Sequence, residues 1–456
     1  MISRWTTAFA VIATLAFSPS LATASDANVE RQLDEMQKRM QQMEDKLQAT
    51  NDQLESANQR VEEQSQLIEQ SGLAETRGSS NGLPGFLGEI TVGGWVAASY
   101  LYNINDPNDD FNDGVQGLNS GLNGAFYPLH PDHNSFSLDQ VWWEIERPIS
   151  EEHRGGFRLD TTYGKTGALL SGPNNRGDRD DSSIYVSQAY VQYLAPIGDG
   201  LTFKAGKFNT LIGVEVAQTV YNWNITRGSL WTLLQPVDHI GVLASYAFGD
   251  SGFDIALGGV NGFRPDDPDR NDAKSFLGRV GWTGDTASFA LSNIYGAEGT
   301  GDDGDETGVL DAIVKFNPTD RLAFWLNGDY AYNDSFGKNA WGVAAAGRFG
   351  ITDRTGIALR GEYVSLDENP FGLDGIDGVD GFEFLAPGET DTWGITATID
   401  HLLTDNLMVR AEARYDWVTK DDVDNEEFWE DSAELDDDQI VVGAEIIYNF
   451  NKFGGE

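Results

Sequence analysis

The sequence has no cysteine in its 456 residues, so disulfide bonds and thiol chemistry are excluded. Bases are scarce as well, since 30 Lys and Arg stand against 73 Asp and Glu and give a formal net charge of -43 at pH 7. This balance argues against a nucleic-acid partner, because phosphate backbones are bound by basic surfaces. After the N-terminal segment, no apolar run approaches the roughly 20 residues that a membrane-spanning helix requires.

Signals for catalysis are also scarce. The chain contains neither a Walker loop nor an H-E-x-x-H zinc motif. It has only 5 histidines, and these do not combine with serine and aspartate into a convincing catalytic set. A lipase or protease would need such a set, so the sequence predicts a protein that is not an enzyme and needs no organic cofactor.

The N-terminal residues have the pattern of an export signal. Arg4 precedes the short apolar stretch 8–17, and Ala22-Thr23-Ala24 forms a cleavage site of small residues. We expect residues 1–24 to be a secretory signal peptide. A short membrane anchor is the alternative, but the apolar stretch is too short to cross a bilayer.

A heptad repeat follows the export signal. Its first apolar positions are occupied by Leu33, Met40, Leu47, Leu54, Val61 and Ile68. This spacing predicts an α-helical coiled coil over residues 25–70, with a single solvated helix as the alternative. Residues 71–87 are rich in Gly, Ser, Asn and Pro, which is typical of a flexible linker.

From residue 88 onward the period of the pattern changes to two. In the segment 407–417, apolar residues such as Val409 and Tyr415 alternate with charged residues such as Arg410 and Glu412. About sixteen segments of this kind predict an all-β, antiparallel transmembrane barrel over residues 88–450, with apolar side chains facing lipid and charged side chains facing a water-filled lumen. Residues 451–456 would be a C-terminal tail.

Connection lengths support a barrel in the outer membrane. Tight turns such as 196–200 and 403–406 alternate along the chain with long connections such as 104–135 and 209–238. Outer-membrane barrels combine short periplasmic turns with long outer loops in this way. We therefore expect the barrel in the bacterial outer membrane, in contact with its lipid, and the coiled coil in the periplasm.

Charged residues on the proposed inner face are candidates for lining a pore. They are Arg158, Asp160, Lys204, Arg321, Asp329, Arg360, Glu362, Arg410, Glu412 and Arg414. Opposed rows of both signs would orient water and solutes in the lumen. The alternative is that they pair across strands and only stiffen the barrel.

The connection 209–238 is unusually apolar for an outer loop, with residues such as Trp223, Trp231 and Leu234. An exposed apolar patch of this kind is costly in water. We expect the connection to fold into the barrel or to pack on a neighbouring subunit. If it folds inward, Glu215 and Arg227 are candidate constriction residues.

The other long connections are strongly acidic. Residues 421–438 hold eleven acids and no base. Ca²⁺ or Mg²⁺ could order such segments and bridge them to lipopolysaccharide phosphates, because hard cations prefer oxygen ligands. The alternative is a solvated acidic surface. The pair His130 and His133 is a candidate for another metal site, with an incidental pair of loop histidines as the alternative.

A motif in the stretch 213–242 sharpens these expectations. It reads Gly213-x-Glu215, then Asn224-x-x-Arg227-x-x-x-Trp231, then Pro236-x-x-His239-x-Gly241, and it resembles the β-barrel porin-2, or OmpL-like, family of bacterial outer-membrane porins. The resemblance covers residues 86–450. It implies a pore-forming outer-membrane protein, and together with the coiled coil it suggests a homotrimer.

Three functions fit this resemblance. The first is passive diffusion of small hydrophilic solutes through a water-filled channel. The second is a substrate-selective porin for sugars or for anions such as phosphate. The third is a structural tether that reaches the peptidoglycan through its coiled coil.

Overall fold

The computed structural model describes residues 38, 41, 89–104, 129–130, 134–171, 184–263, 272–298, 305–333, 338–367, 389–420, 429–431, 434–436, 438–451 and 453. The chain divides into two units, residues 1–88 and 89–456. In the first unit only Lys38 and Gln41 are described, and both are helical and exposed. The rest of the predicted coiled coil, the predicted signal peptide and most of the predicted linker lie outside the described residues.

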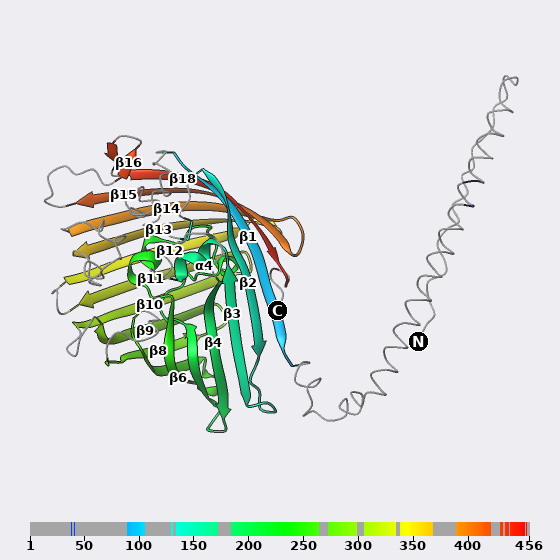
Figure 1. Ribbon diagram of the computed structural model, residues 1–456, viewed down its shortest axis with the longest axis vertical. Helices are drawn as coiled ribbons and strands as arrows, with labels where there is room; N and C mark the ends of the chain where they lie inside the picture. Colours follow the sequence, from blue (N-terminus) through cyan, green and yellow to red (C-terminus); the bar gives the residue numbers. More distant parts are fainter. Residues whose placement is uncertain are drawn as a thin grey trace, which may run out of the picture. The chain divides into compact units, whose positions relative to one another are not determined.

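The second unit is a closed antiparallel barrel of sixteen strands (Figure 1). Its strands are β1 (Thr91–Asn103), β2 (Ser135–Arg147), β3 (Gly155–Tyr163), β4 (Ile184–Ala195), β5 (Leu201–Asn209), β6 (Asp238–Ala247), β7 (Phe253–Val260), β8 (Ser275–Thr283), β9 (Ala287–Glu298), β10 (Asp305–Thr319), β11 (Leu322–Asn333), β12 (Lys338–Gly350), β13 (Thr355–Asp367), β14 (Glu389–Leu402), β15 (Leu407–Lys420) and β18 (Asp438–Asn449). The predicted fold class and strand number are thus confirmed for the barrel.

Neighbours in the ring are mostly neighbours in sequence, and β1 closes the ring against β18. Closure pairs every strand on both sides and removes the exposed edges that an open sheet would have. The short strands β16 (Trp429–Asp431) and β17 (Glu434–Asp436) form a separate two-stranded sheet between β15 and β18.

Helical segments occur only in the connections of the described part of the barrel. They are α4 (Lys165–Leu170), η3 (Thr219–Tyr221), α5 (Ser229–Leu234) and η4 (Gly249–Ser251). Among the described residues, none of the helices has the length and apolar character needed to span a membrane.

The two faces of the barrel differ as the alternation requires. On β15, Arg410, Glu412 and Arg414 are buried on the inner side, whereas the intervening Ala411 and Ala413 are exposed on the outer side. Large apolar residues are exposed around the outer face, among them Val242, Leu257, Val280, Leu291, Leu310, Leu326, Val343, Leu359, Ile395, Val442 and Ile446. Such an outer face is stable when lipid, rather than water, surrounds it.

Aromatic rings form a continuous row on the outer face of β12 to β15. The Tyr363 ring lies 5.0 Å from Trp341 and 4.4 Å from Trp393, measured between centroids. Trp393 stacks on Trp417 at 5.8 Å. Tyr and Trp gather in this way at the interface between membrane and water, where an apolar ring and a polar group are both satisfied.

Candidate functional site

The connection between β5 and β6, residues 210–237, lies inside the barrel, and we call it the inserted loop (green in Figure 1). Its helix α5 contacts the inner faces of β11, β12, β13 and β14. In the strand order of the ring, β13 and β14 lie opposite β5 and β6, so the loop reaches across the lumen. The structure therefore gives the first of the two arrangements expected from the apolar composition of this segment.

Apolar contacts hold α5 against the barrel. Leu230 and Leu234 are buried in a cluster that includes Ala340, Ala344 and Val364 from β12 and β13. Small residues on the inner face of β12 leave room for the helix. A Cβ added at Gly342 would lie 2.7 Å from Cδ1 of Leu230, closer than side chains tolerate. The sequence of β12 is thus fitted to the helix that covers it.

Glu215 and Arg360 form the central polar contact of the loop. Nη1 of Arg360 donates to Oε1 of Glu215 at 2.7 Å and to the carbonyl oxygen of Thr226 at 2.8 Å. The other oxygen of Glu215 accepts a hydrogen bond from the backbone amide of Gly228 at 2.8 Å. Arg360 is fully buried, so its charge depends on these partners and on Glu362, whose carboxylate lies 3.4 Å away.

Glu412 binds the backbone of the loop directly. Its carboxylate accepts hydrogen bonds from the amides of Ile225 at 2.6 Å and Thr226 at 3.0 Å, and from the Thr226 hydroxyl at 2.6 Å. The Thr398 hydroxyl on β14 donates to the same carboxylate at 2.7 Å. Bonds from several donors to one carboxylate fix the position of this loop segment.

Two further arginines of β15 hold the loop through its carbonyl groups. Arg410 donates to the carbonyl oxygen of Asn222 at 2.8 Å and is paired with Glu445 of β18. Arg414 donates to the carbonyl oxygen of Arg227 at 2.6 Å and to Asp416 at 2.8 Å. Each of these guanidinium groups therefore donates hydrogen bonds both to a carboxylate of the barrel and to a backbone carbonyl oxygen of the loop.

Arg227 joins different parts of the loop to one another. Its guanidinium donates to the carbonyl oxygens of Val216 at 2.6 Å, Ile225 at 2.7 Å and Ala217 at 3.0 Å. Burial lowers the pKa of Arg227 to about 10, and the group stays charged at neutral pH. Arg227 therefore fixes the shape of the loop, while Glu215 fixes its contact with the barrel.

Uncharged residues complete the anchoring, and sequence reasoning did not single them out. Gln140 of β2 donates to the carbonyl oxygen of Ala217 at 2.7 Å and accepts from the amide of Thr219 at 3.1 Å. Gln235 donates to Asn327 at 3.0 Å and to the predicted candidate Asp329 at 2.6 Å. A single amide or hydroxyl in an alternating strand carries no signal that distinguishes it from an ordinary lumen residue.

Other predicted residues lie away from these contacts. Arg158 is partly exposed and pairs with Glu144 at 2.9 Å and with the predicted Asp160 at 2.9 Å. The ammonium of Lys204 lies 4.2 Å from the centroid of the Tyr190 ring. Arg321 belongs to the turn before β11, is 59% exposed and pairs with Asp353 of another turn, so the structure places it at the barrel end.

A cavity of about 170 Å³ separates part of the inserted loop from the barrel. Val214, Glu215 and residues 221–224 line it on the loop side, and Lys315, Asn317 and Trp325 line it from β10 and β11. The loop therefore leaves open space next to Lys315 and Asn317 of β10, although Gln235 bonds it to β11.

His130 lies buried in the β1–β2 connection, and the neighbouring Leu129 packs with Ala217 and Trp231. Burial, and the nearby charge of Arg227 and other arginines, lower the pKa of His130 to about 3. The ring is therefore neutral at pH 7, and its 4.0 Å separation from Asp139 is no charged pair. The predicted partner His133 lies outside the described residues.

The comparisons with known proteins agree with this architecture. The family model described as "Putative beta-barrel porin-2, OmpL-like" matches residues 89–450. No curated protein matches the chain by sequence.

Three solved structures with a similar fold are OprB of Pseudomonas putida, an anion-selective porin from Comamonas acidovorans, and the trimer form of OmpT, an outer membrane protein of Vibrio cholerae. OprB is 13% identical with a TM-score of 0.51 over 82% of this chain and 97% of that chain. The Comamonas porin is 11% identical with a TM-score of 0.50, and the comparison covers 79% of this chain and 99% of that chain. OmpT is 12% identical with a TM-score of 0.50 over 79% and 99%, respectively.

Proposed function

This chain belongs to the putative β-barrel porin-2, OmpL-like family and is an outer-membrane porin, and from that premise we propose that it passes small hydrophilic solutes by passive diffusion through a channel narrowed by the inserted loop. The main support for this proposal is that the inserted loop is bonded to β13 and β15 inside a closed barrel. A barrel of this strand number has an aqueous lumen, and a loop fixed within the lumen reduces its cross-section.

The charges outside the loop contacts support a general channel. Arg158 pairs with Glu144, Glu146 and Asp160, so its positive charge is surrounded by acids. Mixed charges of this kind orient water without attracting one sign of ion strongly. Small polar solutes are the expected cargo.

Selectivity for sugars, or for anions such as phosphate, is the alternative. The Comamonas porin is described as anion-selective, but here the candidate arginines are bound to carboxylates, Arg360 to Glu215 and Arg410 to Glu445. Neutralised arginines offer little attraction to a passing anion, which favours the non-selective channel.

Deletion of residues 218–232 tests the constriction. We expect larger single-channel conductance in planar bilayers, because the deleted segment includes η3 and the start of α5. Liposome swelling with sugars, amino acids and organic acids would then rank the solutes. Absence of conductance in the wild-type protein would reject the channel, whereas unchanged conductance of a folded deletion variant would reject only the constriction.

We infer a homotrimer for the assembly. One similar structure, OmpT of Vibrio cholerae, is described in a trimer form, and the predicted coiled coil supplies a second means of association. Light scattering in detergent should give the mass of three chains. A variant lacking residues 25–70 would separate the two contributions, because a trimer that survives this deletion is held by the barrel.

The remaining expectations concern the two sides of the membrane. We propose that the coiled coil lies in the periplasm, where it contacts peptidoglycan, and sedimentation with purified cell wall before and after deletion of residues 25–70 tests this. We also propose that Ca²⁺ or Mg²⁺ binds the acidic outer connections and bridges them to lipopolysaccharide. An unchanged melting temperature after chelation would count against those ions.

A further inference from the structure

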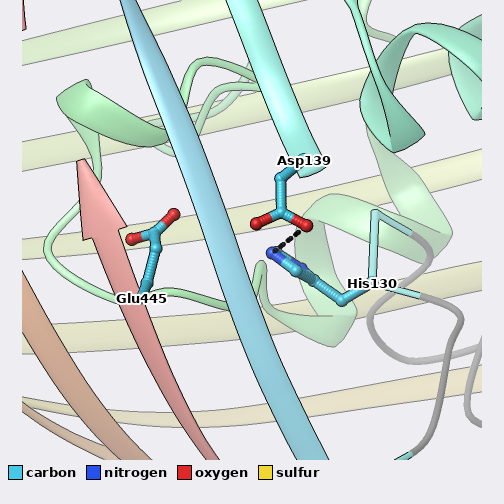
Figure 2. A group of neighbouring side chains, drawn as sticks. All are labelled: His130, Asp139 and Glu445. Carbon is cyan, nitrogen blue, oxygen red and sulfur yellow. Dashed lines mark ion pairs between the residues drawn. The ribbon is translucent and has the colours of Figure 1, made fainter. Parts of the chain in front are cut away.

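Three potential metal ligands from three separate elements meet inside the barrel. They are His130 from the β1–β2 connection, Asp139 from β2 and Glu445 from β18, and all three are buried. Their ligand atoms lie within 4.8 Å of one another. Figure 2 shows these side chains, with Asp139 and Glu445 on either side of β1, which lies between β2 and β18 in the ring.

A β-bulge places Asp139 in this group. In the register of β1 with β2, Ala97 pairs with Gln140 and Ala98 pairs with Leu138, so Asp139 is the extra residue. Successive residues of a regular strand point to opposite faces, yet Asp139 and Gln140 are both buried, at 1% and 2% exposure. Bulges redirect side chains in this manner and often accompany functional sites.

Buried polar atoms next to Asp139 give an independent indication of a ligand. Neither ring nitrogen of His130 has a hydrogen-bond partner among the described residues, although the side chain is only 4% exposed. The same holds for the hydroxyl of Ser99, which is directly opposite Glu445 in the β1–β18 register. A buried polar group without a hydrogen-bond partner carries an uncompensated desolvation penalty, so a binding partner at this point would relieve that penalty.

Glu445 retains capacity to bind an ion. Its Oε1 accepts one hydrogen bond, from the Thr219 hydroxyl at 2.8 Å, while Arg410 occupies Oε2. A carboxylate oxygen has two lone pairs, so Oε1 can accept a second partner. A bound cation would share this carboxylate with Arg410.

We propose that His130, Asp139 and Glu445 bind a divalent transition-metal ion, for which Zn²⁺ is the best match. One neutral imidazole and two carboxylates suit Zn²⁺, which takes N and O ligands at about 2.0–2.2 Å and often keeps a water as its fourth ligand. Ligand atoms of such a site lie about 3.3 Å apart, whereas the atoms here lie within 4.8 Å of one another, so the side chains need to approach by up to about 1.5 Å. Ca²⁺ and Mg²⁺ bind oxygen ligands, so the imidazole nitrogen of His130 would not suit them.

The ion would connect the β1–β2 connection to the barrel next to the inserted loop. Leu129, adjacent to His130, packs against Ala217 and Trp231 of that loop. Thr219, in turn, donates to Glu445. Zn²⁺ at this position therefore fixes one connection and one side of the loop at the same point of the lumen.

Zinc titration of the full-length protein in detergent tests the proposal, after treatment with chelator and dialysis. Calorimetry gives the affinity, elemental mass spectrometry gives the bound Zn²⁺ per chain, and visible absorption with Co²⁺ reports coordination independently of transport. His130→Gln removes the imidazole of the proposed site, and His401→Gln is the matched control, because His401 is exposed and contacts the Thr355 hydroxyl.

We expect one Zn²⁺ per chain that depends on His130, in the wild type and in His401→Gln alike. Loss of a group that is only hydrogen-bonded to a metal ligand already weakens metal affinity about 10–100-fold. Removal of the ligand itself in His130→Gln should therefore weaken zinc affinity at least tenfold. Ca²⁺ binding should not change in His130→Gln.

Equal zinc affinity of His130→Gln and wild type would overturn the site, as would a wild type that retains no zinc. If circular dichroism shows that His130→Gln is misfolded, Asp139→Asn decides. Weaker zinc binding by folded Asp139→Asn supports the site, and unchanged binding rejects it.

Discussion

Two parts of the inner barrel surface carry the same residue types but differ in what covers them. We call Arg360, Glu412 and Arg414 of β13 and β15 the anchoring surface, and Arg158 and Lys204 of β3 and β5 the open surface. The Arg360 side chain is 0% exposed and bonded to the loop, whereas the Arg158 side chain is 22% exposed and bonded to its own strand neighbours. The inserted loop, rather than the residue type, decides which charges stabilise the fold and which meet the solute.

The energetic consequence follows from burial. A charge removed from water must be compensated by a partner, so loss of one partner leaves the other uncompensated. An exposed pair is screened by solvent and contributes about 0–1 kcal/mol. The comparison therefore predicts large effects of substitutions on the anchoring surface and small effects elsewhere.

The largest effect is expected for Arg360→Met. The substitution leaves Glu215 and Glu362 buried without their shared cation, and we expect a loss of about 3–5 kcal/mol of unfolding free energy. Urea unfolding of the folded protein in lipid measures this loss. Arg321→Met is the control, because its pair with Asp353 is exposed and should cost about 0–1 kcal/mol.

The double variant Arg360→Met with Glu215→Gln sharpens this prediction. Removing both charges should recover part of the loss, because the coupling between neighbours in one network is measured by such a cycle. Equal destabilisation by Arg360→Met and Arg321→Met would show that the anchoring surface has no special role.

A smaller effect is expected where the loop helix meets β12. In Gly342→Ala the new Cβ would lie 2.7 Å from Leu230 and 2.8 Å from the backbone oxygen of Tyr363, so α5 must shift. We expect a cost of about 1–3 kcal/mol and altered conductance. Gly361→Ala on β13 is the matched control, because a Cβ there meets nothing within 4 Å.

The alternating pattern predicted the barrel because membrane and lumen impose it locally, residue by residue. The inner face can be assigned to the charged Arg410 and the outer face to the apolar Ala411 from their place in the alternating pattern alone. The apolar segment around Trp231 likewise indicated burial, since water does not tolerate it on an outer loop.

The division of the inner charges into the anchoring surface and the open surface could not be predicted in the same way. Arg158 and Arg360 each stand two residues before a buried acid, Asp160 and Glu362, so their local sequences look alike. Only the path of the loop across the barrel distinguishes them. Asp139 illustrates the same limit, because its inward position results from a bulge that shifts the register by one residue. Such long-range contacts leave no periodic signal in a single sequence.

The smallest effect on stability, and the clearest effect on transport, is expected for Lys315→Gln. Lys315 is exposed to the lumen and lines the cavity between the loop and β10, so its removal should change stability by less than about 1 kcal/mol. Its charge acts on ions that pass this cavity, and we expect the reversal potential in a KCl gradient to shift toward cations. The shift should grow at low salt, because screening falls as the Debye length rises.

Lys274→Gln is the control for this prediction, because it makes the same change of net charge in the connection before β8. An equal shift of the reversal potential in both variants would mean that ions do not pass through the cavity between the loop and β10.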